Sequence, residues 1–234
     1  MTSQRQMPTS PMAAAGVGDI VQSISSYLAS RHVPPTQTWL QVFAPTIRTS
    51  TPLAALQKTA LFRILATDLQ TSIKSSPTST LPVGIALPSV KEARIPGPVT
   101  VQVLDIEDIG RSCWSQVESI EAQERGETTK GREIIRVVAD EDDNAGVEAT
   151  RAIAGEDKST GPHKLLLQDA KGTKVYALEF RTVEGVNTGL AIGAKLVLSG
   201  CVVARGVIML EPRCVELLGG KVDAWDKKLS LIHI

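Results

Sequence analysis

The sequence predicts an α+β protein in which a bundle of helices precedes a small closed barrel of short strands. Two observations carry this prediction: apolar residues recur every three to four positions before residue 74 and every second position after residue 98. In addition, 42% of the 234 residues are hydrophobic, which is enough apolar surface to build a core. A chain that is disordered throughout is therefore excluded.

Three helices are expected in the first part of the chain. Prolines divide the helical pattern, because Pro34 ends the first helix and Pro45 ends the second. The third and longest runs from about Thr51 to Leu69. We therefore predict a three-helix module over residues 17–74, preceded by a disordered Ser/Thr/Pro-rich tail over residues 1–16.

The segment of residues 75–98 contains five prolines interleaved with serine and glycine. This density forbids a helix, and we predict an extended linker that lies along the surface.

Five short strands are expected in the remaining domain, residues 99–228. Two short connections, Asp169–Gly172 and Ala204–Gly206, predict hairpins within a mostly antiparallel sheet. Five such strands suggest a closed barrel of the OB-fold type, with a five-stranded sandwich fragment as the alternative. The strands are placed at residues 99–104, 164–168, 175–181, 195–203 and 207–211.

A connection of about 50 residues, from 111 to 162, separates the first two predicted strands and far exceeds a usual loop. Residues 118–158 within it hold twelve acids and six bases, so this insertion carries about −6 while the rest of the neutral chain carries about +6. A solvated loop without a function is the alternative to a functional arm. The sharpest acidic run consists of Asp140, Glu141, Asp142 and Asp143.

Catalytic, cofactor and metal sites are not expected. No glycine-rich phosphate loop or nucleophile elbow is present, and only three histidines are available. Asp105, Glu107 and Asp108 follow the first strand, but no other ligand converges on them in the sequence. With 25 basic and 25 acidic residues, the chain as a whole also lacks the charge that drives tight non-specific binding to nucleic acid or anionic membranes.

The third predicted strand bears on single-strand binding, because OB folds stack bases on exposed aromatic rings. Its alternation places Tyr176, Leu178 and Phe180 in the core. The outer face would then hold Val175, Ala177, Glu179 and Arg181, which favours contact with a protein over base stacking.

Several short motifs, taken in order, give the chain a resemblance to a known family. The end of the barrel reads RGVIMLEP at residues 205–212 and VELLGGKV at residues 215–222. The other segments are Pro34-Pro35 with Trp39-Leu40, Thr67-Asp68-Leu69 with Leu81-Pro82, Trp114-Ser115-Gln116-Val117, and Gly193-Ala194-Lys195. By the order and spacing of these segments, the chain resembles the RecQ-mediated genome instability protein family over about residues 17–228.

The resemblance implies a non-catalytic scaffold that binds topoisomerase III through its OB-fold domain and links it to a RecQ-family helicase. In this family the insertion reaches towards the topoisomerase gate and modulates its opening, in a complex that dissolves double Holliday junctions and suppresses crossovers. A nuclear protein of DNA repair, recombination and replication is then expected, touching DNA only indirectly or weakly, with no membrane, metal or cofactor. The chain resembles a short, fungal-like form, without the second OB domain of vertebrate relatives.

The resemblance also implies where the topoisomerase would be contacted. The expected residues are Trp114, Ser115, Gln116 and Lys195, together with the acidic run Asp140, Glu141, Asp142 and Asp143.

Two other functions stay open. One is a sequence-independent single-stranded DNA-binding protein that uses Arg181, Lys195 and Arg205 as a basic track. The other is a helical adaptor whose barrel is purely structural.

The last six residues, 229–234, read LSLIHI and match the translation of a transposase-end sequencing adapter. We expect them to be an artefact, with the native chain continuing differently after Lys228.

Overall fold

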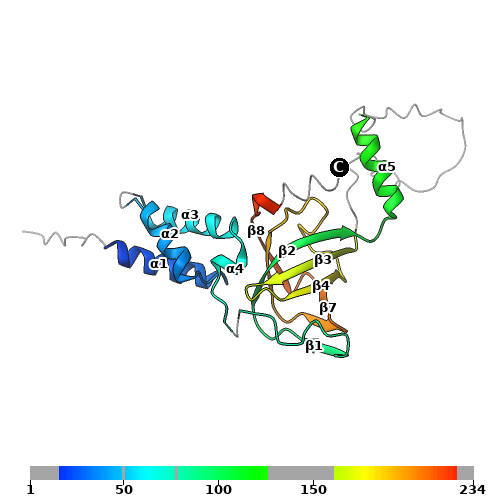
Figure 1. Cartoon of the computed structure of the whole chain (residues 1–234), viewed down its shortest axis with the longest axis horizontal. Helices are drawn as coiled ribbons and strands as arrows, with labels where there is room; N and C mark the ends of the chain where they lie inside the picture. Colours follow the sequence, from blue (N-terminus) through cyan, green and yellow to red (C-terminus); the bar gives the residue numbers. More distant parts are fainter. Residues whose placement is uncertain (1–15, 49–50, 77–78, 126–160, 226–234) are drawn as a thin grey trace, which may run out of the picture.

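A computed structural model describes residues 16–48, 51–76, 79–125 and 161–225. In these ranges a helical module lies beside a curled mixed sheet, which confirms the predicted α+β class and the order of its parts (Figure 1). None of the helices in these ranges has the length and apolarity needed to cross a bilayer. Nearly all of the predicted tail and all of the six terminal residues fall outside the described ranges.

The helical module consists of α1 (Val17–Ser30), α2 (Gln37–Phe43), a 3₁₀ turn (Ala44–Thr46), α3 (Leu53–Leu65) and α4 (Leu69–Ser72). The predicted third helix therefore ends four residues early. The cause is Asp68, whose side chain accepts a hydrogen bond from the Gln70 backbone N–H and caps a new short helix. The buried core of the module includes Ile24, Leu28, Phe43, Leu56, Ile64 and Leu69.

The sheet is assembled from eight strands: β1 (Glu92–Arg94), β2 (Val99–Asp108), β3 (His163–Asp169), β4 (Lys174–Glu179), β5 (Lys195–Leu198), β6 (Val202–Ala204), β7 (Val207–Leu210) and β8 (Val215–Gly219). Their order is β1-β6-β7-β4-β3-β2-β5-β8, and every pair is antiparallel except β4 with β7. All five predicted strands are present. The fourth is divided into β5 and β6 around Gly200, while β1 and β8 are additional.

The segment predicted as a surface linker belongs to the barrel instead. Leu81, Ile85 and Ile95 are buried in the barrel core, and β1 pairs with β6. Prolines exclude a helix but still permit an edge strand, so the composition alone could not separate these outcomes. Residues 79–98 are therefore part of the β domain and not a spacer between two domains.

Both predicted hairpins are present. Arg205 and Gly206 have φ values of 51° and 82°, which is the left-handed backbone that a two-residue hairpin turn requires. In the turn between β3 and β4, one carboxylate oxygen of Asp169 accepts hydrogen bonds from the backbone N–H groups of Lys171 and Thr173.

The predicted facing of β4 is wrong. Val175, Ala177 and Glu179 are the buried residues, whereas Tyr176 is 51% exposed and Phe180 is 63% exposed. Both faces of this strand carry apolar residues, so the alternation identified a strand but not its core face. The pairings of Ala177 and Val175 with the buried Leu165 and Leu167 of β3 determine which face is inside.

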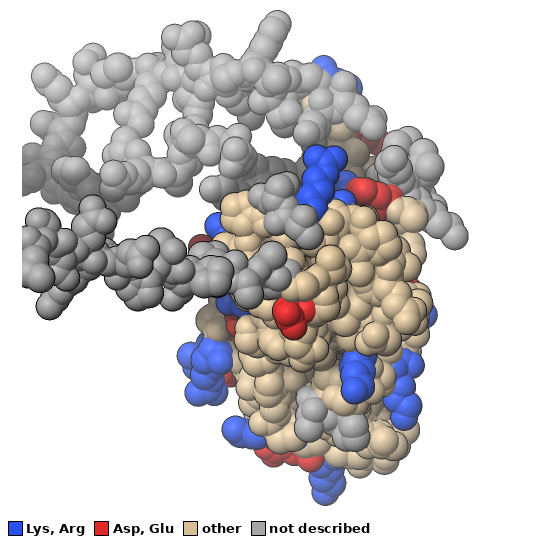
Figure 2. Space-filling view, turned by 90° about the vertical axis from the view of Figure 1, so that its left-hand side faces the viewer, with Lys and Arg blue, Asp and Glu red and all other residues tan. Residues whose placement is uncertain are grey.

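The face that the helical module turns away from the barrel is mostly uncharged (Figure 2). Among the helical residues with exposed apolar side chains are Val42 at 73% and Phe62 at 75%. This face contrasts with the charged insertion and is a second surface on which a partner could be sought.

Candidate partner-binding site at the insertion

Strands β2 and β3 bring the two ends of the insertion together. The Ile109 backbone N–H donates to the Pro162 carbonyl at 3.0 Å. A Cβ atom built on Gly110 would lie 2.2 Å from the Gly161 carbonyl oxygen, so no larger residue fits there without moving the backbone. We call these four residues, Ile109, Gly110, Gly161 and Pro162, the neck.

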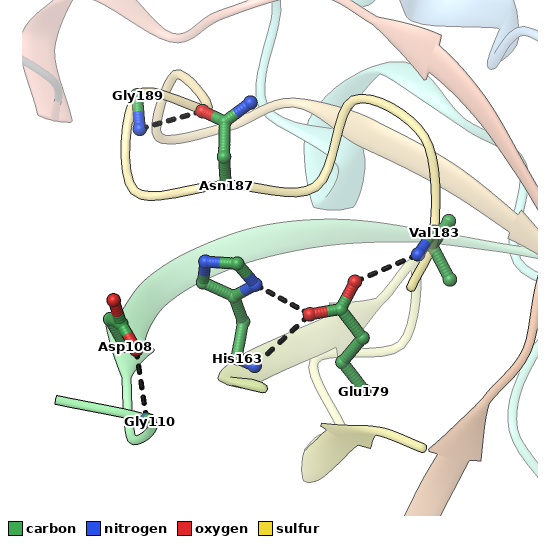
Figure 3. Close-up of polar contacts among 7 residues, drawn as sticks. All are labelled: Asp108, Gly110, His163, Glu179, Val183, Asn187 and Gly189. Atoms are coloured by element: carbon green, nitrogen blue, oxygen red, sulfur yellow. Dashed lines mark hydrogen bonds and ion pairs between the residues drawn. The ribbon is translucent and has the colours of Figure 1, made fainter. Parts of the chain in front are cut away.

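A buried pair beside the neck fixes the start of β3 (Figure 3). Glu179 Oε2 lies 2.5 Å from His163 Nδ1 and accepts the His163 backbone N–H at 3.1 Å, while Oε1 accepts the Val183 N–H at 2.8 Å. Both side chains are 3% exposed. Because buried polar groups are costly without partners, this network favours one position for the strand that receives the insertion.

The insertion leaves the barrel as a helix, α5 (Cys113–Glu124), which projects away from the sheet (Figure 1). The Ser112 hydroxyl accepts the Ser115 N–H at 3.2 Å, as an N-cap does. The Gln116 side chain donates to the carbonyls of Asp108 and Arg111 at 2.9 and 3.1 Å. The first turn of α5 is therefore held against the end of β2.

Apolar side chains on α5 are exposed. Trp114 is 79% exposed, and Val117 and Ile120, at successive three-residue steps, are about half exposed. Residues three apart are neighbours on a helix, so the three form a strip. An exposed strip that includes a tryptophan is typical of a surface that is covered by a protein partner.

The residues predicted from the resemblance separate into three groups. Trp114 is exposed and available, whereas Ser115 and Gln116 hold the start of α5 by hydrogen bonds. Asp140, Glu141, Asp142 and Asp143 lie outside the described residues. Lys195 belongs to a different part of the molecule.

The prediction that Lys195 lies on a contact surface is wrong. Its side chain is fully buried between the barrel and the helical module, where Nζ donates to the Leu65 carbonyl at 2.8 Å and the Gly193 carbonyl at 2.7 Å. The last carbonyls of a helix lack helical partners and carry partial negative charge, so the end of α3 suits an ammonium group. Burial lowers the pKa of Lys195 from 10.5 to about 8.

Sequence reasoning also missed Gln102, which lies beside Lys195 at this contact. Its Oε1 accepts the Leu69 N–H at 2.9 Å, and its Nε2 donates to Asp68 Oδ1 and Gln168 Oε1 at 2.8 and 2.9 Å. The sequence offered little signal, because Gln102 alternates with valines in residues 99–103 just as Thr100 does. We call Leu65, Leu69, Gln102 and Lys195 the junction.

The predicted basic track for single-stranded DNA loses one of its three members. Arg181 and Arg205 are exposed, but the buried Lys195 cannot contact a ligand on the surface. The track is therefore not formed as predicted.

The carboxylates after the first predicted strand have structural partners. Asp105 accepts the Ile106 N–H, Glu107 pairs with Lys164 at 2.7 Å, and Asp108 accepts the Gly110 N–H at 2.8 Å. Across the part of the chain that the structure describes, no cluster of three or more His, Cys, Asp or Glu side chains could hold a metal ion.

Two family models match the chain. The model described as RMI1, N-terminal OB-fold domain, matches residues 69–231, and the model described as RMI1, N-terminal helical domain, matches residues 28–72.

Curated proteins named RecQ-mediated genome instability protein 1 are similar to this chain. The protein from Schizosaccharomyces pombe is 28% identical over 214 residues, which cover 88% of this chain and 82% of that protein. The protein from Xenopus laevis is 27% identical over 91% of this chain and 35% of its own length, and the protein from Mus musculus is 25% identical over 86% and 30%. The chain thus spans about a third of the vertebrate relatives and most of the fission yeast one.

Proposed function

The chain belongs to the RecQ-mediated genome instability protein 1 family, and from this premise we propose that it is a non-catalytic scaffold that binds topoisomerase III. The coarse role, a RecQ-associated function in genome stability, follows from the family name. The finer proposal is that the chain links topoisomerase III to a RecQ-family helicase in the nucleus, for double Holliday junction dissolution and crossover suppression during recombination, repair and replication.

The observation that carries the proposal is the way α5 leaves the barrel. The neck and the buried Glu179 network favour one point of departure, and α5 then presents Trp114 to solvent at 79% exposure. A large aromatic side chain on a helix that stands away from its own core suits contact with a second protein.

The mechanism we propose is a bias on the partner's conformational equilibrium. If α5 and the rest of the insertion contact the open and closed topoisomerase differently, the difference shifts the equilibrium between these states. A coupling free energy of about 1–3 kcal/mol is typical of such effects. The barrel and α5 then both supply affinity, and the insertion also supplies the modulation.

The test begins with co-elution of the chain and topoisomerase III from the same organism on a sizing column at physiological salt. A second form lacks residues 111–160, with Gly110 and Gly161 joined by a short Gly-Ser bridge, which the proximity of the two ends at the neck permits. We expect the full chain to co-elute and to stimulate decatenation, and the shortened form to bind in part without stimulating.

Two results would contradict the proposal. Separate elution of a chain shown to be folded by circular dichroism would remove topoisomerase binding. Equal stimulation by the full and shortened forms would remove the role of the insertion.

A further inference from the structure

Two adjoining hollows lie where the helical module meets the β domain. The larger has a volume of about 630 Å³ and is lined by the end of α1, by residues 74–82 and by residues 96–99. The smaller has a volume of about 340 Å³ and shares Ser76, Thr80 and Pro82 with the larger. Both volumes are within the range of sites that hold a ligand. We call the two hollows together the groove.

The walls of the groove are held together by hydrogen bonds. The Lys74 backbone N–H donates to the Pro34 carbonyl at 2.8 Å, which ties the segment after α4 to the segment after α1. The Thr100 hydroxyl donates to the His32 carbonyl, which ties the end of α1 to the start of β2. The groove is therefore formed in the free chain, and a ligand would bind there without first ordering its walls.

The charged lining of the groove is basic. His32 and Lys74 line the larger hollow and Lys171 lines the smaller one, while the described residues of both linings include no aspartate or glutamate. Neither lysine side chain forms an ion pair with another described residue. Asp169 contacts the same wall, but it is fully buried and accepts backbone N–H groups, among them that of Leu81. The two ammonium groups are thus available to an acidic ligand.

The uncharged lining favours a peptide chain over nucleic acid. No aromatic ring occurs among the described residues that line either hollow, so no base could stack there. Rigid apolar walls with a few polar groups suit an extended peptide, whose successive side chains point to opposite sides. The apolar walls of the larger hollow are Pro34, Pro82, Pro96, Pro98 and Val99.

We infer that the groove is a docking site for an extended, acidic peptide segment of a partner protein. Carboxylates of the segment would lie near Lys74 and Lys171, and its apolar side chains would pack against the prolines.

This site is separate from the surface on α5. The groove includes Val99, the first residue of β2, whereas α5 follows the other end of this ten-residue strand, about 30 Å away (Figure 1). The inference therefore goes beyond the proposed function and does not depend on topoisomerase III. A scaffold with both sites would hold two partners at opposite ends of one strand.

The test begins with a random peptide library displayed on phage and selected on the full chain. Peptides of about 12 residues reach about 40 Å when extended, which is long enough to occupy both hollows. We expect enrichment of sequences in which Asp or Glu alternates with small apolar residues. A labelled synthetic copy of the most enriched sequence then measures affinity by fluorescence anisotropy.

Two kinds of variant separate charge from shape. Lys74→Glu and Lys171→Glu should each weaken peptide binding about tenfold, because each replaces attraction with repulsion. Ala29→Trp places a large ring in the larger hollow without changing the charge, and it should weaken binding by a similar factor.

Matched controls are available on α3. Lys58→Glu and Ala54→Trp make the same changes at exposed positions outside the groove and should leave peptide binding unchanged. Melting curves verify that each variant is folded. If Ala29→Trp is not folded, the double variant Lys74→Glu/Lys171→Glu, which alters only exposed side chains, provides the test.

Three results would overturn the inference. The first is a selection on the full chain that enriches no acidic sequence. The second is an enriched peptide that binds folded Ala29→Trp or the double lysine variant as tightly as it binds the wild type. The third is displacement of the peptide by an equal concentration of oligothymidine of about 20 nucleotides, which would make the groove a site for polyanions in general.

Discussion

Polar side chains are buried both at the junction and in the His163–Glu179 pair beside the neck, but their surroundings differ. At the junction, Ala170 and Leu218 of the β domain pack against the apolar core of the helical module, alongside the polar contacts of Lys195 and Gln102. Beside the neck, the Glu179 network holds the start of β3, while α5 with the exposed Trp114 projects from the end of β2.

The difference indicates that buried polar side chains have two separate roles in this protein. At the junction, apolar packing supplies the attraction between two folded parts, and directional hydrogen bonds select one orientation. At the neck, directional bonds position a segment whose own apolar residues remain exposed. Changes at the junction should therefore act on stability, and changes on α5 should act on binding.

The largest expected effect is from Glu179→Ala. The substitution leaves His163 and two backbone N–H groups without their buried acceptor, so we expect the free energy of unfolding to fall by about 4 kcal/mol. Chemical denaturation measures this change. Glu184→Ala, at an exposed position in the following loop, is the control and should change stability by less than about 0.5 kcal/mol. A similar small change for both variants would mean that the pair does not hold the neck.

Lys195→Met should be the next most costly change. Methionine fills the volume of the lysine stem but leaves the Leu65 and Gly193 carbonyls unpaired, at a cost of about 2 kcal/mol. Lys58→Met, on the exposed side of α3, is the matched control. If both variants unfold at the same denaturant concentration as the wild type, the junction does not depend on the ammonium group.

The stability contributed by Lys195 should also change with pH. Its folded pKa of about 8 lies below the ordinary 10.5, so the unfolded chain binds more protons between these values and stability rises with pH. Between about pH 7 and pH 9.5 the gap between wild type and Lys195→Met should widen by about 2 kcal/mol. Other titrating groups are common to both proteins and cancel in the difference. A gap that narrows over this range would contradict the buried, desolvated lysine.

The smallest expected effect on stability is from Trp114→Ala. The side chain is exposed, so unfolding should change by less than about 0.5 kcal/mol. Affinity for topoisomerase III, measured by titration calorimetry, should nevertheless fall about tenfold, because a buried interface tryptophan is a common source of binding energy. Phe62→Ala is the control for loss of an exposed aromatic. A tenfold loss with Phe62→Ala alone would assign the interface to the helical module.

Much of the fold could be predicted from the sequence, because periodicity and turn residues are local signals. The first three helices, the five strands and the turn at Arg205-Gly206 all follow from such signals, whereas α4 and α5 were not predicted. The face of β4 could not be determined, because apolar residues occupy both sides of that strand. Lys195 was misplaced for a different reason: its partner at Leu65 is 130 positions away, and no local pattern shows that the end of α3 packs there.

Among the predicted contact residues that the structure describes, Trp114 is the one left exposed for a partner. The neck could have been anticipated in part from Gly110 and Gly161 at the two ends of the insertion, but the pairing of His163 with Glu179 requires the register of β3 and β4. Pairings between residues far apart in the sequence determine the geometry of the site. The order of the motifs therefore identified the family, but it did not show where individual side chains lie.

Hydrogen exchange on the chain, alone and bound to topoisomerase III, tests the central claim most directly. We expect complex formation to slow exchange of the backbone amides in α5, residues 113–124, and to leave the already buried Leu69 amide at the junction unchanged. Protection confined to the uncharged face of the helical module, with α5 exchanging as it does in the free chain, would contradict the role that we assign to the insertion.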